Sequence, residues 1–385
     1  MTPLRLGILC RRFWPLGGGN EHALADLACD LLSQQVMPQI ITTKPSTANW
    51  PSEFTFRGVP VVRLSRSQTP GIGAMRHWFS LYRWIRSHRQ QLDAILVSEL
   101  RAETYMAIAA LQNTSIPVLI RIERAGPGGD LDQLMANPLG SRILQQAKLA
   151  KAFIVSSEAA KAELITAGIS PDSIHKIVPK AYQPQPITRI ERQDARDAFA
   201  AINYDLGLPD NCRLLVAHGR LRTSEGFHEL VAAWGKVLLQ HPSTRLWIVG
   251  DGPERGRLFN QLKDLGLAYL VTLPGAVDDF SGLLAAADGW IIPSHGESAP
   301  GLIPAVRSRN LPLVLSDTPA HREHALPENL TWWSQPRDVR SLAEAICQML
   351  EQSPSSTSIP ASTTAESTYG DSAAAYRELL EKVCR

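Results

Sequence analysis

The sequence has few cysteines and no long apolar run. Its 385 residues include five cysteines, Cys10, Cys29, Cys212, Cys347 and Cys384, with no CxxC pair and no Cys/His pair at metal-ligand spacing. We therefore expect reduced thiols, mostly in cores, and neither a disulfide framework nor zinc. No stretch approaches the roughly 18 apolar residues of a spanning helix. The N-terminal MTPLRLGILCRRFWP reaches its arginines too early for a signal peptide. These absences predict a cytoplasmic protein.

Several catalytic motifs are also missing. The ten histidines form no HxxxH or HExxH pair, and no GxSxG elbow occurs, which argues against metallohydrolases and serine hydrolases. The turn after the first apolar run is not GxGxxG, and no acid ends the second run, PQIITTKP. A dinucleotide site of the dehydrogenase kind is therefore disfavoured, although a Rossmann oxidoreductase is retained as the third alternative. We expect no metal site and no cofactor.

Length and charge indicate two different halves. A chain of 385 residues exceeds what one hydrophobic core usually supports, so two domains are expected. The net charge is only +2, yet residues 1–190 hold 21 Lys and Arg against 13 Asp and Glu. A basic N-terminal half can attract anionic acceptors or acidic lipid surfaces. Nucleic acid is not expected, because no nucleic-acid motif accompanies the charge.

Apolar strand-like runs alternate with helical patterns along most of the chain, which predicts doubly wound α/β sheets. The alternation pauses at a proline-containing candidate linker near residues 179–191 and then restarts. We predict an N-terminal Rossmann-like domain over residues 1–185, and a docked helix over residues 371–385. A second such domain is predicted over residues 191–352, across a cleft from the first. A Ser/Thr/Pro-rich surface loop or disordered segment is expected over residues 353–370.

Polar residues follow several of the predicted strands. Gly17, Gly18 and Gly19 could bring backbone amides close to an anion at a helix N-terminus, although a tight turn without a ligand explains them equally well. Arg220 follows a strand in the second half and could grip a diphosphate, or be a surface arginine. Glu297, between a strand and a short helix, could accept hydrogen bonds from sugar hydroxyls or cap the helix.

The stretch MRHWFSLYRWIRSHRQQ has a strongly amphipathic helical pattern. At 100° per residue, Met75, Trp78, Leu81, Tyr82 and Ile85 share one face. Opposite them lie three arginines together with Phe79: Arg76, Arg83 and Arg86. Aromatics beside arginines fit a helix at an anionic membrane, so residues 75–89 are a candidate peripheral contact at the inner face of the membrane. A core-packed helix with a solvated basic face explains the same pattern.

Taken in order, these motifs resemble the group 1 (family 4) glycosyltransferases over roughly residues 5–350. The resemblance includes the glycine loop GGNEHALADLACDLLSQQ and then HGRLRTSEGF, IVGDGPERGRL, LPGAVDDFSGLLAAADGWIIPSHGES and LPLVLSD, at the family's spacing. It implies the GT-B fold, in which two Rossmann-like domains face each other across a cleft. The domain over residues 1–185, to which the helix over 371–385 returns, is then the acceptor side, and the domain over 191–352 binds the donor. It also implies retaining transfer of a sugar from a nucleotide-sugar donor without a metal ion.

The resemblance implies roles for individual residues. Gly18 and Gly19 match the loop near the donor phosphates, Arg220 the diphosphate-binding arginine, and Val277 the residue whose backbone faces the base. Glu297 matches the first acid of the E-x7-E motif, which contacts the donor sugar. The residues around this acid are expected at the donor as well: Ser294, Ser298, Ala299 and Gly301.

Four positions depart from the family pattern. Glu225 stands where a diphosphate-binding lysine is usual, and Ala305 replaces the second acid, which holds the ribose. Asn310 replaces a glycine, and Glu123 replaces the usual N-domain histidine. We expect Arg222 to supply the missing positive charge and Glu123 to take a polar, catalytic role facing the acceptor.

These patterns together predict a retaining, metal-independent glycosyltransferase. Its expected partners are a nucleotide-sugar donor and a carbohydrate or lipid-linked acceptor, in assembly of an envelope polysaccharide or glycolipid. Arg220 would stabilise the leaving diphosphate, and Glu297 would orient the sugar. The alternative is a non-catalytic relative that keeps the fold as a binding or partner subunit, which Glu225 and Ala305 favour.

Overall fold

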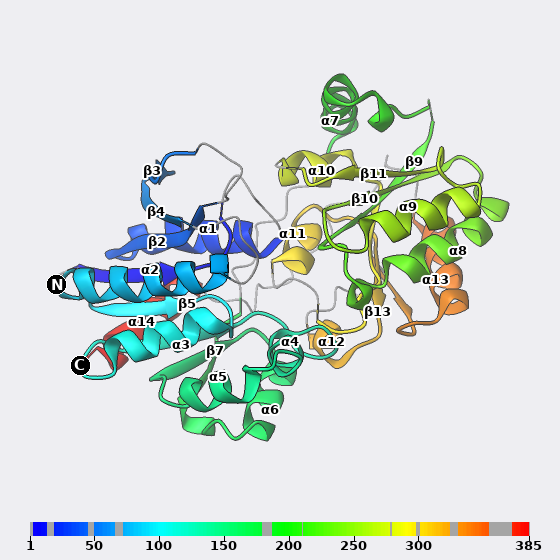
Figure 1. The fold of residues 1–385 in the computed structure, drawn as a ribbon. Coiled ribbons are helices and arrows are strands. Elements are labelled where there is room, and N and C mark those ends of the chain that lie inside the picture. The colour runs from blue at the N-terminus through cyan, green and yellow to red at the C-terminus, as the bar shows by residue number, and fades with distance from the viewer. Residues whose placement is uncertain are drawn as a thin grey trace. The chain divides into compact units, whose positions relative to one another are not determined.

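The computed structural model describes residues 3–13, 19–44, 50–65, 72–178, 187–209, 211–277, 279–297, 301–323, 330–353 and 372–384. The chain divides into two compact units (Figure 1). The N-terminal unit comprises Met1–Lys180 together with Tyr369–Arg385, and the C-terminal unit comprises Ala181–Thr368. Apart from Ser353, the segment predicted as a Ser/Thr/Pro-rich loop lies outside the described residues.

The N-terminal unit is built on an eight-stranded sheet with the order β3-β4-β2-β1-β5-β6-β7-β8. All neighbours pair in parallel except β3 and β4. The central strands are short and fully buried, and apart from Arg121 in β6 they are apolar, as expected where helices cover both faces of a sheet. The strands are β1 (Leu4–Leu9), β2 (Val36–Lys44), β3 (Glu53–Phe56), β4 (Val59–Ser65), β5 (Ala94–Val97), β6 (Val118–Ile122), β7 (Ala152–Val155) and β8 (Ile174–Lys176).

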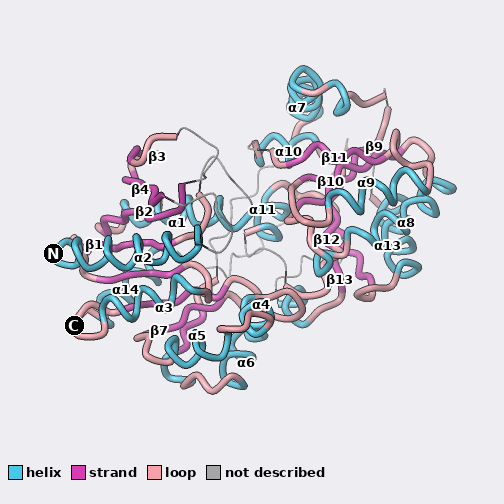
Figure 2. Tube along the Cα trace, viewed as in Figure 1, coloured by secondary structure: helices cyan, strands magenta, loops and turns pink. Residues whose placement is uncertain are grey.

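Helices flank both faces of this sheet and bury a core on each (Figure 2). One core joins Leu24 of α1 and Leu380 of α14 to strand residues such as Ile8, so the C-terminal helix packs in the N-terminal unit. The other core includes residues of α2, α3, α5 and α6. The helices are α1 (Gly19–Ser33), α2 (Ile72–His88), α3 (Ala102–Leu111), α4 (Asp130–Met135), α5 (Gly140–Ala147), α6 (Glu158–Thr166) and α14 (Ser372–Val383), with short 3-10 turns η1 (Arg89–Gln91) and η2 (Pro171–Ser173).

The C-terminal unit has a six-stranded parallel sheet with the order β11-β10-β9-β12-β13-β14. Numbered from its own first strand, this is the 3-2-1-4-5-6 order of the Rossmann fold. Trp247 and Trp290 are fully buried in strands on either side of β9. The strands are β9 (Arg213–His218), β10 (Thr244–Val249), β11 (Val271–Gly275), β12 (Gly289–Ile292), β13 (Leu313–Ser316) and β14 (Thr331–Ser334).

Two further cores lie in this unit. One gathers apolar residues of α8, α9 and α13, and the other gathers residues of α7, α10 and α11. The helices are α7 (Arg189–Ile202), α8 (Phe227–Gln240), α9 (Arg255–Asp264), α10 (Phe280–Ala286), α11 (Leu302–Ser308), α12 (Pro319–Glu323) and α13 (Val339–Gln352), with 3-10 turns η3 (Tyr204–Leu206) and η4 (Thr223–Glu225).

The predicted linker overlaps the start of a helix. Residues 179–186 lie outside the described part, but α7 begins at Arg189 with a capping box. The Thr188 side chain accepts from the Glu191 backbone, and the Glu191 carboxylate accepts from the Thr188 backbone. The T-x-x-E pattern in the sequence indicates this helix start, but the sequence analysis did not use it. Strands β3, β8 and β14 were also missed.

The buried stripe of α2 differs from the predicted one. Leu81 and Ile85 are buried as expected, but Met75 is 67% exposed. The stripe is centred on His77, Leu81 and Ile85, which places Met75 at its outer edge. The prediction that Met75 shares one face with Leu81 and Ile85 was therefore wrong. Phe79 is 66% exposed, as its position among the arginines predicted.

The prediction that most cysteines lie in cores is confirmed. All five cysteines are free thiols, of which Cys10, Cys212 and Cys347 are buried. Among the helices within the described ranges, none combines the length and apolar character that a membrane crossing requires.

Candidate functional site

The two main predicted donor residues follow adjacent strands of the C-terminal sheet. Arg220 lies just beyond β9 and Glu297 just beyond β12, and these strands pair in parallel. Between them the strand order reverses, because the chain winds from β9 toward β10 and β11 and then returns to β12. In open α/β sheets the crevice outside the carboxyl ends of the strands at this switch point is where ligands bind. The topology thus brings Arg220 and Glu297 to one edge.

The loops that carry these residues are joined directly. The His295 backbone N–H donates to the Ser224 carbonyl over 2.9 Å. Gly226 has φ +73°, and a Cβ built on it would lie 2.0 Å from the Pro293 carbonyl oxygen. Both the backbone conformation and the close approach therefore require glycine at this position. The β9 loop and the β12 turn form one packed structure.

Hydrogen bonds join His295, in the turn after β12, to the side chains of Glu229 and Arg337. Arg337 Nε donates to His295 Nδ1 over 3.3 Å, and His295 Nε2 lies 3.0 Å from Glu229 Oε1. Since an arginine N–H can only donate, Nδ1 must be the acceptor and the proton sits on Nε2. This hydrogen bond lowers the pKa of the Glu229 carboxyl group. Arg337 has φ +64°, a strained conformation for a residue with a side chain.

The turn itself is closely packed. Ser294 is 2% exposed, and its hydroxyl donates to the Gly296 carbonyl over 3.1 Å. His321 is fully buried. Its Nδ1 atom lies 2.8 Å from the Ser316 carbonyl oxygen, and its Nε2 atom lies 3.4 Å from Ser294 Oγ. Glu297, the last described residue of the turn, is 4% exposed. The Ser294 hydroxyl is therefore used within the protein.

Arg220 and Arg222 are half-buried on the loop after β9, and the Nε atom of Arg220 is shielded from solvent. The loop rests on the next one, because Leu221 N–H donates to the Asp251 carbonyl over 3.1 Å. Glu225 is only 8% exposed. Its carboxylate lies near Gly219, where an added Cβ would be 3.6 Å from Oε2. Glu225 thus packs against the base of the loop that carries Arg220.

The remaining residues that the family resemblance singled out belong to different elements. Val277 follows β11 and packs partly against the core, and Gly301 directly precedes α11. Gly19 is the first residue of α1, in the other unit. Ala305 is 3% exposed in α11, among apolar neighbours. Gly18, Ser298 and Ala299 lie outside the described residues.

Glu123 lies at the carboxyl end of β6 in the N-terminal unit and is 4% exposed. Its backbone N–H donates to Asp130 Oδ2 over 2.6 Å, and Arg121 Nη1 lies 3.8 Å from its Oε1. Burial raises the pKa of Glu123 well above its ordinary range; Arg121 opposes this, whereas Asp130 adds to it. Glu123 is thus held in an ionic cluster inside the unit rather than on an open surface.

Within the described residues, no group of three or more His, Cys, Asp or Glu side chains is arranged to hold a metal ion.

The network of Glu229, His295 and Arg337 was missed by the sequence reasoning. Glu229 lies 66 residues before His295 and Arg337 lies 42 residues after it, so no local sequence pattern indicates the network. The only signal was the position of His295 inside the turn already singled out for Glu297.

Two family models match the chain. The model described as "Glycosyl transferase 4-like domain" matches residues 18–179, and "Glycosyl transferases group 1" matches residues 212–352. A lipopolysaccharide core biosynthesis glycosyltransferase, LpsE of Rhizobium meliloti, is 31% identical over 109 residues, which are 28% of this chain and 31% of the relative. For the first curated relatives, the match spans between 15% and 33% of their own length.

Solved structures match over nearly the whole chain. Sucrose-phosphate synthase from Thermosynechococcus elongatus has a TM-score of 0.71 at 18% identity and covers 99% of this chain and 96% of its own. HepE of Anabaena, solved with UDP-glucose, has a TM-score of 0.68 at 17% identity and 90% coverage of both chains. At such identities the likeness shows the fold alone, which is the predicted GT-B fold.

Proposed function

Because the chain belongs to the group 1 glycosyltransferases, we propose that it transfers a sugar from a nucleotide-sugar donor to a carbohydrate or lipid-linked acceptor. The observation that carries this proposal is the meeting of the Arg220 loop and the Glu297 turn at the switch point of the C-terminal sheet. Two similar proteins support this proposal, since LpsE is a glycosyltransferase and HepE was solved with UDP-glucose. The product class that fits is an envelope polysaccharide or glycolipid.

In this proposal the C-terminal unit binds the donor. Arg220 faces the diphosphate and stabilises the negative charge that develops on it as the sugar leaves. Arg222, half-buried on the same loop, adds the positive charge that Glu225 does not supply. Glu297 orients the donor sugar, and the Arg337–His295–Glu229 network holds its turn in place. The reaction proceeds with retention at the sugar carbon and without a metal ion.

The test begins with donor binding. A thermal-shift panel of UDP, ADP, GDP and their sugars should identify a ligand, since saturation at 100 times Kd stabilises by about 2.7 kcal/mol. Arg220→Ala should then weaken that ligand about tenfold to a hundredfold, the range for losing a charged hydrogen-bond partner. Arg245→Ala is the matched control, because Arg245 lies at the amino end of β10.

The non-catalytic alternative is favoured by Glu225 and by Ala305, whose buried methyl group offers the ribose no acceptor. Nucleotide binding without turnover of any nucleotide sugar would support that reading. Absence of binding by every nucleotide and nucleotide sugar would also favour the non-catalytic alternative. Unchanged donor affinity in Arg222→Ala would remove the proposed role of that arginine.

On the acceptor side, we propose that Glu123 takes part through its ionic cluster. Glu123→Ala removes the carboxylate that lies 3.8 Å from Arg121 Nη1 and should lower turnover more than it lowers donor affinity. Full wild-type turnover in this variant would exclude the role. Glu123→Gln, which keeps the shape but not the charge, separates electrostatics from packing.

We also propose peripheral contact with an anionic membrane surface at the inner face of the membrane, through α2. The exposed side of this helix presents Met75 and Phe79 between Arg76, Arg83 and Arg86, whose side chains are all exposed. Exposed apolar groups flanked by arginines can insert at the level of acidic headgroups.

Sedimentation with vesicles tests this contact. The protein should sediment together with phosphatidylcholine vesicles that contain about 30% phosphatidylglycerol, and it should not sediment with vesicles of pure phosphatidylcholine. Changing Arg76, Arg83 and Arg86 to Ser should abolish sedimentation. The same change at the exposed residues Arg142, Lys148 and Lys151 should not. Equal loss in both triple variants would leave only a general charge effect and would refute the helix as the contact.

A further inference from the structure

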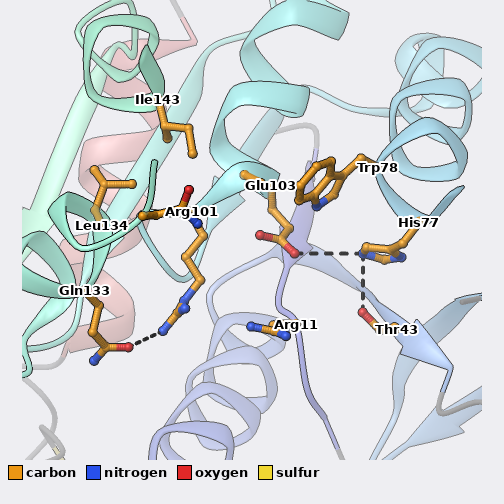
Figure 3. Close-up of a pocket in the computed structure, with 11 residues that line it drawn as sticks. Arg11, Thr43, His77, Trp78, Arg101, Glu103, Gln133, Leu134 and Ile143 are labelled. Atoms are coloured by element: carbon orange, nitrogen blue, oxygen red, sulfur yellow. Dashed lines mark hydrogen bonds and ion pairs between the residues drawn. The ribbon is translucent and has the colours of Figure 1, made fainter. Parts of the chain in front are cut away.

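Buried histidines lie at the carboxyl edge of both sheets, but their contacts differ. In the N-terminal unit, His77 lines a cavity of about 200 Å³ (Figure 3). Its Nε2 atom lies 3.3 Å from Thr43 Oγ1 and 4.0 Å from Glu103 Oε1, so both contacts use the same ring nitrogen. In the C-terminal unit, His321 is fully buried and contacts the protein with both ring nitrogens. His321 therefore connects two different segments of the chain.

These two segments follow neighbouring strands. Because β12 and β13 pair in parallel, Ser294, after β12, and Ser316, the last residue of β13, lie at the same edge of the sheet. The Ser316 carbonyl can only accept, so His321 Nδ1 carries a proton and donates to it over 2.8 Å. In the neutral ring Nε2 is then an acceptor, 3.4 Å from Ser294 Oγ. The Ser294 hydroxyl thus lies between two acceptors, His321 Nε2 and the Gly296 carbonyl.

The helix that carries His321 is anchored by local contacts. The Thr318 hydroxyl accepts from the His321 backbone N–H over 3.2 Å, and the Thr318 carbonyl accepts from the Arg322 backbone N–H over 3.1 Å. The Arg322 side chain donates to both oxygens of Asp317 and lies 4.8 Å from the centre of the Trp333 ring. These contacts hold α12 against the ends of β13 and β14, so the imidazole is fixed before any ligand arrives.

Ser294 and Gly296 belong to the short turn that leads to Glu297, and all residues of this turn are buried. In closely packed structure, a displacement of one group is passed to its neighbours. Glu297 directly follows Gly296, so a shift of the Gly296 carbonyl also moves the Glu297 backbone. His295 is held from α8 by Glu229. His321 holds the same turn from the side of β13 and α12.

We propose that His321 is a positioning residue for the donor sugar: it fixes the turn over residues 294–297 and thereby the direction of the Glu297 carboxylate. It touches no substrate and acts through the Ser294 hydroxyl. The contact between Glu297 and a donor sugar rests on the proposed function, whereas the support of the turn by His321 does not. The effect of His321 is confined to the sugar part of the donor, because Arg220 and Val277 lie on other loops.

The first test compares a nucleoside diphosphate with its sugar derivative. Calorimetry on the full-length protein measures Kd for UDP and UDP-glucose, ADP and ADP-glucose, and GDP and GDP-mannose. His321→Asn keeps a donor near the place of Nδ1 and has no polar atom at the place of Nε2. It should weaken the nucleotide sugar about fivefold or more, as for the loss of one hydrogen bond, and leave the affinity for the nucleoside diphosphate unchanged. His321→Gln, whose longer side chain reaches the place of Nε2, should restore most of the affinity.

Two further variants show whether the effect passes through Glu297. His241→Asn is the matched control, because His241 is half-buried at the C-terminal end of α8, at the opposite edge of the sheet. It should bind both ligands like the wild type. Adding His321→Asn to Glu297→Ala should weaken the nucleotide sugar no further than Glu297→Ala alone, because residues that act through one contact are not additive.

Hydrogen exchange tests the support of the turn without any donor. The backbone amides of residues 294–297 should exchange faster in His321→Asn than in the wild type. In His241→Asn they should exchange at the wild-type rate. A faster exchange confined to this turn, with the rest of the C-terminal unit unchanged, separates positioning from a general loss of stability.

Three results would overturn the inference. They are unchanged exchange of the turn in His321→Asn, equal weakening of the nucleoside diphosphate and its sugar derivative, or full additivity with Glu297→Ala. Failure of the proposed function looks different: the turn would exchange faster in His321→Asn, while neither the wild type nor any variant bound a nucleotide or a nucleotide sugar.

Discussion

At the scale of single residues, His295 shows how a side chain acquires its state from distant partners. Arg337 fixes Nδ1 as an acceptor, and Glu229 receives the Nε2 proton. Neither partner is near His295 in sequence, so the residues around His295 do not indicate which of its ring nitrogens carries the proton. For Glu297, residue type and position left a helix cap and a sugar contact open, and the family resemblance favoured the contact. The structure adds that Glu297 is buried and follows a strand at the switch point.

A pH dependence follows from Glu229. Its folded-state pKa lies below its ordinary value because His295 donates to it. Its contribution to stability is therefore complete above the unfolded-state pKa of about 4.3 and is lost as the pH falls through the folded-state value. Glu229→Gln should be less stable than the wild type at pH 6, with the difference shrinking toward pH 3.5. Urea midpoints across this range measure it, and a difference that grows on acidification would contradict the assignment.

At the scale of elements, alternating strands and helices were predicted well because their signal is local. Runs such as β5 and β12 are continuous buried apolar stretches, which a sequence displays directly. The β9 loop behaves differently, since Gly226 is required by a contact with Pro293 in another loop. The left-handed conformation of Gly226 also marks the start of α8.

Alanine substitutions at Gly226 and Gly235 distinguish the effect of a loop–loop contact from the effect of helix propensity. Gly226→Ala places a Cβ 2.0 Å from the Pro293 carbonyl oxygen and strains a positive φ, so we expect a loss of about 2 kcal/mol or more. Gly235→Ala lies within α8, where an added Cβ meets nothing within 4 Å. It should stabilise by about 0.5–1 kcal/mol through helix propensity. Guanidinium unfolding of both variants measures the contrast, and equal effects would contradict the packing argument.

At the scale of the whole molecule, the chain ends return to one unit. Helix α14 shares its core with α1 and β1, although more than 330 residues separate Leu380 from Leu31 in the sequence. A helix over residues 371–385 was predicted from the sequence, and the structure identifies the residues against which it packs.

Leu380→Ala tests this arrangement. Leu380 is 1% exposed, so truncation should cost about 2–4 kcal/mol through lost burial and a residual cavity. The loss should fall on the N-terminal unit, because every buried neighbour in its cluster belongs there. Hydrogen exchange should quicken in β1 and α1 and stay unchanged in β9 and α8. An equal increase in both units would show that α14 supports more than its own core.

The sequence by itself determined the fold class, the order of most strands and helices, and the positions of Arg220 and Glu297 after their strands, because local apolar periodicity and chain order encode these features. Only the tertiary structure decided that Glu225 packs near Gly219, that Arg337 and Glu229 hold His295, and that a polar cavity opens beside Arg101. The physical reason is that these contacts join residues far apart in the chain. Burial and hydrogen bonding among them depend on where the sheet brings their strands, which no local pattern records.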